Sequence, residues 1–348
     1  MRILVFGGTR FIGRAIVTRL LREGHQVTLV NRGMSEDPFG TRVRRIIGDR
    51  RKPETIERAS TRREYDAVVD ITAYHESQTT AILEAFRDRI EHLVHISTAA
   101  VYLIREALLP PFRESDFAGR LTPKQPGSES SWLYAYHKRR CEEALARAWE
   151  EDRFPFTALR LPMVVGPHDY TQRADAYLER IASGGPVILP EGGLNSWGFL
   201  WVEDVAEAVA SNLANSAAFG RAYNLAQREA TTLRQFVELA TGFLQARSQI
   251  LTLPTAWLKA VGLGTPFSPY THHHDILLDC HAAEEELLFR PTPAVRWIDQ
   301  LVRDFRNRWT GTVQAFGATR SFELVLAREV AKLRLPTFSP VAAPVPTT

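Results

Sequence analysis

Short apolar runs alternate with stretches of helical spacing along the first half of the chain. The runs are typical of buried strands and cover Arg2–Phe6, Gln26–Asn31, 45–48, Ala67–Asp70, 93–97 and Phe156–Leu161. Between them, residues 11–23, 77–86 and 131–150 place apolar side chains three and four positions apart, as an amphipathic helix requires. This order predicts an α/β fold with a parallel, doubly wound sheet and helices on both faces.

Beyond residue 166 proline, glycine and aromatic residues interrupt the pattern, as in "SGGPVILPEGG", until residues 196–226 resume it. We expect residues 1–168 to form a nucleotide-binding domain, with 196–226 returning to it. Residues 169–195 and 227–320 should form a smaller C-terminal substrate-binding part, with helices at 231–243, 282–288 and 294–309. Residues 321–348 should form a C-terminal helix and a disordered proline-rich tail.

The composition adds few constraints beyond those of an ordinary globular protein. The 348 residues carry 43 basic and 40 acidic side chains, a net charge of +3, too balanced to indicate a nucleic-acid or membrane partner. A basic cluster at 42–52 is interpreted as a solvated face, with a phosphate-facing patch as the alternative. Two cysteines make no disulfide framework, and no apolar run approaches the ~20 residues of a membrane helix. We therefore expect a cytoplasmic protein without a leader or membrane segment.

The turn "FGGTRFIG" joins the first strand to the first helix, as in the Rossmann dinucleotide-binding fold. Gly7 permits a tight turn, and Gly13 lets the helix pack close to the strand. Backbone N–H groups near Phe11 and Ile12 should point at a pyrophosphate. The alternative is a purely structural glycine turn. The predicted cofactor contacts of this turn are Gly7, Thr9, Arg10, Phe11, Ile12 and Gly13.

The end of the second strand indicates which dinucleotide binds. NAD sites usually carry an acid there for the ribose 2′-hydroxyl, whereas this chain has Asn31 and Arg32. A guanidinium pairs with a 2′-phosphate, and Arg10 can reach the same region. We therefore expect NADP(H), with NAD as the alternative. In "GDR", we also count Asp49 and Arg50 as cofactor contacts, Asp49 either accepting from the adenine amino group or capping a turn.

Tyr134 and Lys138 lie four residues apart on the long helix predicted at 131–150, and so on one face. A nearby ammonium stabilises a phenolate, which lets a tyrosine exchange protons at neutral pH. The pair is therefore a candidate acid/base for hydride transfer at a carbinol or ketone carbon. Ser97 and Thr98 end the fifth strand, where Rossmann-type ligands bind, and Thr98 is the candidate for orienting the reacting oxygen.

Six motifs in this order, "GGTRFIG", "ISTAAVY", "YAYHK", "LRLPMVVGP", "FLWVEDVAEAV" and "AYNLA", resemble the extended or atypical short-chain dehydrogenase/reductase superfamily of nucleotide-sugar epimerases and dehydratases. The likeness covers residues 1 to about 310. It implies that Thr98 is the catalytic hydroxyl, Tyr134 the acid/base and Lys138 its partner, which also binds the cofactor ribose. The remaining cofactor contacts that it implies are Ile71, Thr72, Ala73, Ser97, Pro162, Met163 and Val164.

Departures from the family pattern narrow the expected reaction. The 4,6-dehydratases carry Asp-Glu after the catalytic Thr and decarboxylating relatives carry Glu, whereas this chain has Ala99 and Ala100. Alanine transfers no proton, so we disfavour dehydration and decarboxylation and expect an epimerase or reductase. The stretch from "GGTRFIG" to "GDR" most resembles a branch that includes chloroplast stem-loop-binding proteins. An RNA-binding or scaffold protein with vestigial catalysis is therefore the alternative function.

The substrate and partners are the least constrained expectations. The resemblance implies a nucleotide-sugar or similar polar molecule, a homodimer formed through two helices, and no nucleic acid. Tyr74 follows the fourth strand and is a candidate substrate contact, together with Thr98. The run His272, His273 and His274 lacks metal-ligand spacing, so we expect no metal site.

Overall fold

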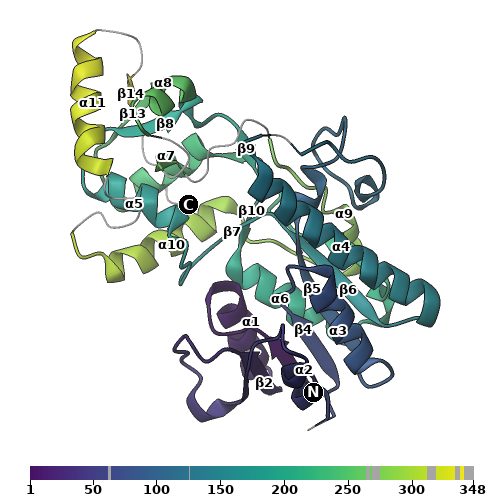
Figure 1. The fold of residues 1–348 in the computed structure, drawn as a ribbon. Helices are drawn as coiled ribbons and strands as arrows, with labels where there is room; N and C mark the ends of the chain where they lie inside the picture. The colour runs from purple at the N-terminus through teal and green to yellow at the C-terminus, as the bar shows by residue number, and fades with distance from the viewer. Residues whose placement is uncertain are drawn as a thin grey trace. The chain divides into compact units, whose positions relative to one another are not determined.

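The apolar runs of the first half build one sheet of seven strands in a computed structural model of the chain (Figure 1). The strands are β1 (Arg2–Phe6), β2 (Gln26–Asn31), β3 (Val43–Ile47), β4 (Ala67–Asp70), β5 (His92–Thr98), β6 (Phe156–Leu161) and β11 (Arg221–Asn224). Their order is β11-β6-β5-β4-β1-β2-β3, and every neighbouring pair is parallel. The order reverses beside β1, which is where such sheets bind ligands. The predicted α/β doubly wound fold is confirmed.

The structure describes residues 1–61, 64–124, 126–263, 267–268, 275–311, 319–333 and 338–340. These residues form two compact units. The first unit comprises Met1–Val164, Phe199–Arg228 and Ile276–Pro291, and the second comprises Val165–Gly198, Glu229–Asp275 and Thr292–Thr348.

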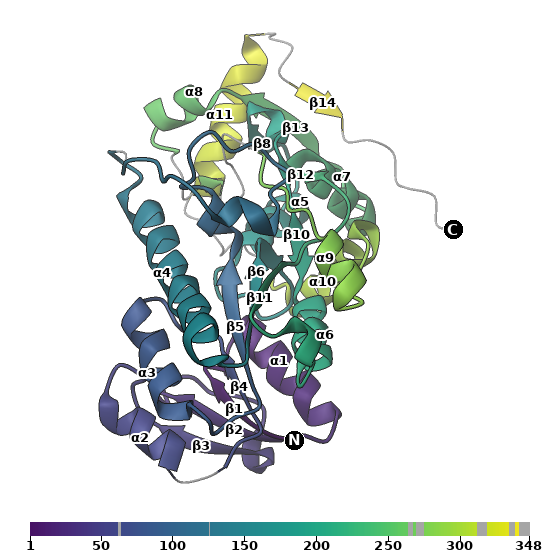
Figure 2. The same cartoon turned by 90° about the vertical axis from the view of Figure 1, so that its right-hand side faces the viewer.

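Helices cover both faces of the sheet in the first unit (Figure 2). On one face lie α1 (Phe11–Arg22) and α6 (Val202–Asn212), and on the other α2 (Pro53–Thr61), α3 (Glu76–Phe86) and α4 (Glu129–Asp152). Each face has its own hydrophobic core, with Ile16, Leu20 and Val205 on the first and Ile56, Leu83 and Leu145 on the second. The hydrophobic pattern did not predict α2, because few of its residues are apolar and only Thr55, Ile56 and Ala59 are buried.

Residues Ile276–Pro291 differ from our expectation, which placed the whole of 227–320 with the substrate-binding part. They return to the first unit, where the Phe112 N–H donates to the Leu277 carbonyl over 2.9 Å. Asn224 Nδ2 donates to the Asp279 carbonyl over 3.1 Å. The short helix α9 (His281–Glu286) adds buried Ala283 to the core beside α1 and α6. The backbone bond to Phe112, the side-chain bond from Asn224 and the burial of α9 therefore outweigh sequence proximity to the second unit.

Among its described residues, the second unit contains a small sheet, a pair of two-residue strands and five α-helices. The sheet pairs β13 (Gln249–Leu253) with β8 (Val187–Pro190) in parallel and with β14 (Phe338–Pro340) in antiparallel. β9 (Ser196–Trp197) pairs with β12 (Thr231–Thr232). The helices are α5 (Arg173–Ala182), α7 (Leu233–Leu244), α8 (Thr255–Ala260), α10 (Ala294–Arg308) and α11 (Arg320–Lys332). Phe236 of α7 stacks on Trp297 of α10 at 6.0 Å between ring centroids, in the core of this unit.

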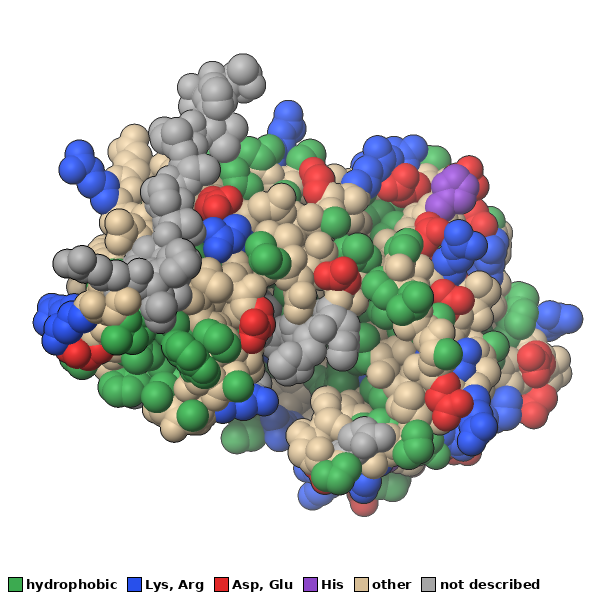
Figure 3. Space-filling model, turned by 90° about the horizontal axis from the view of Figure 1, so that it is seen from above, with side chains coloured by type: hydrophobic (Ala, Val, Ile, Leu, Met, Phe, Trp, Pro, Cys, Tyr) green, Lys and Arg blue, Asp and Glu red, His purple; other side chains and the backbone are tan. Residues whose placement is uncertain are grey.

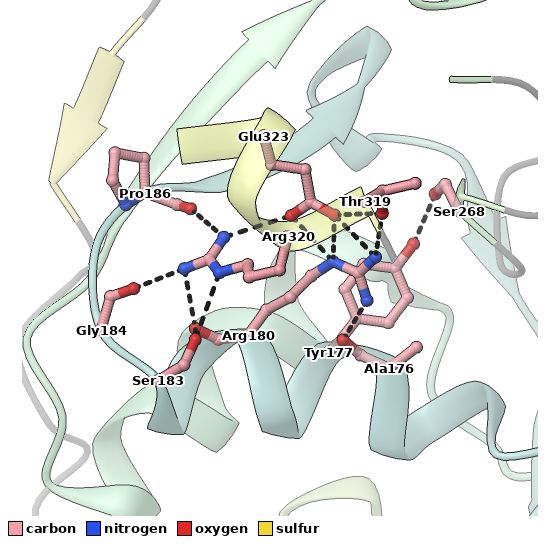
Figure 4. A network of polar contacts seen from close by, with 10 residues as sticks. All are labelled: Ala176, Tyr177, Arg180, Ser183, Gly184, Pro186, Ser268, Thr319, Arg320 and Glu323. Carbon is pink, nitrogen blue, oxygen red and sulfur yellow. Dashed lines mark hydrogen bonds and ion pairs between the residues drawn. The ribbon is translucent and has the colours of Figure 1, made fainter. Parts of the chain in front are cut away.

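A buried ion network fixes α11 in the second unit (Figure 4). Glu323 of α11 lies between two arginines, 2.8 Å from Arg180 Nη2 of α5 and 3.2 Å from Arg320 Nη1. Arg320 Nη1 also donates to the carbonyl of Pro186, which precedes β8, over 2.8 Å. Phe322 and Val325 of α11 are exposed. Seen from above, the surface carries a patch of hydrophobic side chains at the left of the view (Figure 3).

Candidate functional site

After β1, the backbone of the glycine turn and the backbone of the first turn of α1 lie in close contact. Gly7 and Gly8 have φ of +107° and +98°, a region that favours glycine. A Cβ at Gly13 would lie 2.7 Å from the backbone nitrogen of Gly8, so α1 packs against the turn more closely than any side chain allows. Thr9, Arg10, Phe11 and Ile12 complete the curve into α1. The turn is therefore a backbone cradle of the kind that admits a pyrophosphate.

The first turn of α1 is open to an anion. Arg10 is the N-cap residue and makes no side-chain cap hydrogen bond, and no acidic residue lies among the described residues of that turn. Helix N-termini carry unsatisfied N–H groups and a partial positive charge. The cradle and the helix terminus together fit the diphosphate of a dinucleotide.

The residues after β2 meet Arg10. Arg10 Nε donates to Ser35 Oγ over 2.7 Å, and exposed Arg32 lies close enough to act electrostatically on Asp49. The Asn31 side chain accepts from the Gly33 N–H over 2.8 Å and so shapes the turn. Ser35 was not among the predicted contacts, because no neighbouring residue in the sequence identifies it as part of a binding site. Arg10, Arg32 and Ser35 place donors beside the end of β2 with no carboxylate at position 31.

The segment after β3 presents one carboxylate and buries one guanidinium. Hydrogen bonds from Arg51 hold the pKa of Asp49 down, to about 2, so the group is an anion at neutral pH. Arg50 turns inward, donating to Asp70, to Thr72 Oγ1 at 3.1 Å and to the Gln78 carbonyl at 3.1 Å. Its guanidinium carbon also lies 5.0 Å from the ring centroid of Phe6. Because the guanidinium of Arg50 is engaged in these bonds, only the backbone of Arg50 is left to contact a cofactor, and that contact remains a prediction.

The loop after β4 and the end of β5 are joined by Lys138 of α4. Lys138 Nζ donates to the carbonyls of Ala73 at 2.9 Å and Ile96 at 2.7 Å, and contacts His95 Nε2 at 3.2 Å. The residue is only 3% exposed. Ile71 and Thr72 precede Ala73 in the same loop, and both are partly buried. Lys138 thus ties α4 to the carboxyl ends of two neighbouring strands.

Tyr134 lies one turn before Lys138 and remains 41% exposed. Its ring centroid is 6.4 Å from that of Tyr74, which is 48% exposed in the loop after β4. The two phenols therefore line the same edge of the sheet as Thr98, which ends β5. This groups the predicted acid/base, its lysine and one predicted substrate contact.

The two hydroxyls that end β5 point to different surroundings. Ser97 Oγ donates to Glu142, which forms a buried ion pair with Arg160. Thr98 is partly exposed, and its Oγ1 accepts only from the Ala100 N–H, at 3.2 Å, within the described part of the chain. Successive side chains on a strand face opposite sides. Thr98 is therefore the hydroxyl available to a ligand, and the cofactor contact predicted for Ser97 remains untested.

Of the remaining predicted positions, the structure describes Pro162, Met163 and Val164 but not the histidine run at 272–274. Pro162 separates β6 from β7 (Met163–Val165), with Val164 buried and Pro162 and Met163 partly exposed. Ala99, where dehydratases would carry an acid, is buried in the short turn after Thr98. His272, His273 and His274 lie outside the described residues, and among the described ones no cluster of three metal-ligating side chains occurs.

The basic cluster at 42–52 is largely engaged within the first unit. Arg42 donates to the Pro38 carbonyl at 2.9 Å, Arg45 to Asp37 at 2.6 Å and Arg51 to Asp49 at 2.6 Å. Arg44 and Lys52 are exposed. Most of these cations thus serve local structure.

No helix within the described ranges has the length and apolarity needed to cross a membrane.

Comparison with known proteins identifies relatives over most of the first unit. The sequence profile of the "NAD dependent epimerase/dehydratase family" matches residues 3–226. The chloroplast stem-loop binding protein of 41 kDa b from Arabidopsis thaliana is 28% identical over 245 residues, 66% of this chain and 60% of that protein. The 2'-dehydrokanamycin reductase of Streptomyces kanamyceticus is 27% identical over 261 residues, 74% of this chain and 70% of that protein.

Dehydratases and epimerases are also similar. Human dTDP-D-glucose 4,6-dehydratase is 28% identical over 145 residues, 41% of this chain and 35% of that protein. Among solved structures, a UDP-glucose 4-epimerase from Thermotoga maritima, with UDP-glucose, has a TM-score of 0.72 at 19% identity, covering 88% of this chain and 99% of that one. At that identity the structural likeness shows the fold alone.

Proposed function

This chain belongs to the NAD-dependent epimerase/dehydratase family of the extended short-chain dehydrogenase/reductase superfamily, and from that premise we propose that it is an NADP(H)-dependent oxidoreductase or epimerase. Its substrate is a nucleotide-activated sugar or a similar polar molecule with a carbinol or ketone carbon. One observation supports the proposal: Lys138 ties α4 to the loop after β4 and to β5, and the ring of Tyr134, one helical turn earlier, lies 6.4 Å from that of Tyr74, at the edge of the sheet where β5 ends in Thr98.

The cradle around Gly7 and Gly13 would hold the diphosphate, and residues of the loop Ile71–Ala73 would contact the cofactor. When bound, the nicotinamide supplies or accepts a hydride. Tyr134 donates or removes the proton of the reacting oxygen, since it is exposed at this edge. Thr98 orients that oxygen by a hydrogen bond. The buried ammonium of Lys138, one helical turn away, favours the ionised form of the tyrosine.

The choice of NADP(H) over NAD(H) rests on Arg10, Ser35 and Arg32. Together they offer two guanidinium groups and a hydroxyl beside the end of β2. Charge-assisted bonds from such groups stabilise a 2′-phosphate, while position 31 offers no carboxylate to the ribose hydroxyls of NAD. The buried ion pair of Arg50 takes no part in this choice.

We favour a reductase or an epimerase over a dehydratase, although dehydratases are among the relatives. Elimination of water from a sugar needs groups that remove and return protons beside the catalytic Thr. Ala99 and Ala100 supply neither. The relative named a 2'-dehydrokanamycin reductase supports a keto-sugar as the substrate class.

RNA binding remains the second candidate, supported by the relative named a stem-loop binding protein. Exposed Arg44 and Lys52 are the cations of the 42–52 cluster that could meet phosphates. A purely non-catalytic role leaves the grouping of Tyr134, Lys138 and Thr98 without a purpose. RNA affinity that falls steeply with salt and is unaffected by NADPH would favour this candidate.

The decisive experiment identifies the dinucleotide that the purified chain retains, by mass, and then measures NADPH oxidation with a panel of keto-sugars. We expect NADP(H). Retained NAD(H) would refute the assignment made from Arg10 and Ser35. Tightly held cofactor that is not consumed would indicate epimerisation, because an epimerase returns the hydride to the same substrate.

A further inference from the structure

Each N–H of the Lys138 ammonium has an acceptor inside the first unit. Two acceptors are backbone carbonyls, of Ala73 and Ile96, and the third is the imidazole Nε2 of His95 on β5, at 3.2 Å. An ammonium has three donors and no acceptor, so its capacity is filled. A ribose hydroxyl that approaches Lys138 would share an N–H with one of these acceptors, while the other bonds keep the ammonium in place. His95 is the one side chain among the three acceptors.

The direction of this bond fixes the state of the imidazole. An ammonium can only donate, so His95 Nε2 accepts and carries no proton. The ring is therefore neutral, with its hydrogen on Nδ1. That nitrogen is buried and has no hydrogen-bond partner among the described residues. The fold thus leaves one N–H unsatisfied, a cost that is unusual in a buried strand, while it presents Nε2 to Lys138.

The groups around His95 keep the ring neutral. Burial lowers the pKa of His95 well below its usual value, and the positive charges of Lys138 on α4 and of Arg50 after β3 act in the same direction. Asp70 at the end of β4 opposes them. At neutral pH the acceptor is therefore present.

We propose that His95 is a positioning residue that holds the Lys138 ammonium at the edge of the sheet, where it acts on Tyr134 and on the cofactor ribose. The inference rests on the role proposed above for Lys138. His95 contributes the hydrogen-bond acceptor Nε2, which no apolar residue of similar size provides. Loss of the acceptor frees the ammonium to take other positions in the buried site.

The hydrogen bond itself is tested by NMR on the full chain with ¹⁵N-labelled histidine, His95 being assigned by the signal lost in His95→Gln. We expect a neutral ring with the hydrogen on Nδ1 from pH 5 to 9, and a shifted Nε2 resonance in Lys138→Met. Titration of His95 within that range, or an Nε2 resonance indifferent to Lys138→Met, would overturn the proposal.

The consequence is tested by NADPH titration, followed by nicotinamide fluorescence. His95→Leu should weaken binding by up to about tenfold, because the cofactor must then order a long side chain that the protein no longer holds in place. His95→Gln, which keeps an acceptor, should recover most of it. His92→Leu is the matched control, because His92 is equally buried on the same strand and bonds Thr157 at 3.0 Å instead of Lys138.

The possible outcomes separate the two proposals. If Lys138→Met leaves NADPH binding and turnover unchanged, the role of Lys138 in the proposed function fails. If Lys138→Met weakens NADPH binding while His95→Leu matches His92→Leu, the inference about His95 alone fails. Should His95→Leu not fold, the NMR comparison of the wild type with Lys138→Met still decides.

Discussion

Arg10 Nε donates a hydrogen bond to Ser35 Oγ over 2.7 Å, joining the glycine turn to the segment after β2. The bond holds two polar side chains together beside the end of β2, where we propose that the 2′-phosphate of NADP binds. A position that breaks the usual glycine pattern therefore has a partner of its own.

Arg10→Ala and Ser35→Ala should each weaken NADPH binding and leave NADH binding unchanged. We expect about tenfold or more for Arg10→Ala, since a bond to a charged group contributes about 1.5–3 kcal/mol. Titration with both dinucleotides measures the effect. Arg44→Ala, at an exposed arginine of β3, is the control. Equal losses for NADPH and NADH would refute 2′-phosphate recognition.

Tyr134→Phe should abolish turnover and preserve NADPH binding. A positioned proton donor contributes about 10²–10⁴-fold, so the rate of NADPH oxidation with an accepted keto-sugar should fall at least a hundredfold. Tyr136→Phe serves as control, because Tyr136 stacks on Trp132 at 5.1 Å on the same helix. Full activity in Tyr134→Phe would exclude this residue as the acid/base.

Asp70→Asn should destabilise the first unit by about 3 kcal/mol, because it leaves the buried Arg50 guanidinium without its counter-ion. Burial alone would raise the pKa of Asp70, but Arg50 outweighs it and holds the pKa below its usual value. The stability difference should therefore persist at neutral pH and shrink only as acid protonates Asp70. Urea unfolding at several pH values measures it, and a constant difference down to pH 2 would contradict this explanation.

His92→Phe should flatten the acid dependence of stability. Burial lowers the pKa of His92 to about 4 in the native protein. In the unfolded chain the same imidazole has its ordinary pKa near 6.5, so between these two pH values only the unfolded chain binds the proton. Stability contributed by the neutral ring is complete above pH 6.5 and falls as the pH drops toward 4, by about 3 kcal/mol. Denaturant unfolding of both proteins across this range is the measurement. Parallel pH profiles would show that His92 titrates normally.

The sequence was informative where chemistry follows from periodicity. The strand and helix spacing located the carboxyl ends of β1 and β5, so Gly7 and Thr98 could be assigned to one edge, whereas Ala73 was assigned through the family resemblance. The i, i+4 relation of Tyr134 and Lys138 likewise survives on α4 because a helix repeats on that spacing.

Contacts between residues far apart in the sequence could not be predicted. His95 and Lys138 are separated by 43 positions, and nothing local marks a histidine in "LVHIST" as the acceptor for an ammonium. Arg50 was expected both in a solvated basic cluster and as a cofactor contact, yet its guanidinium is buried in an ion pair with Asp70, 20 positions later. Such pairings depend on which strands become neighbours, and that is decided by the whole fold.

The return of Ile276–Pro291 to the first unit sets an order for synthesis. The chain passes from one unit to the other five times, at residues 164, 198, 228, 275 and 291. On the ribosome the first unit therefore remains incomplete until residue 291 has emerged, with α9 the last element to join α1 and α6 in their core. Neither unit can be released by a single proteolytic cut, and the two mature as one interleaved chain.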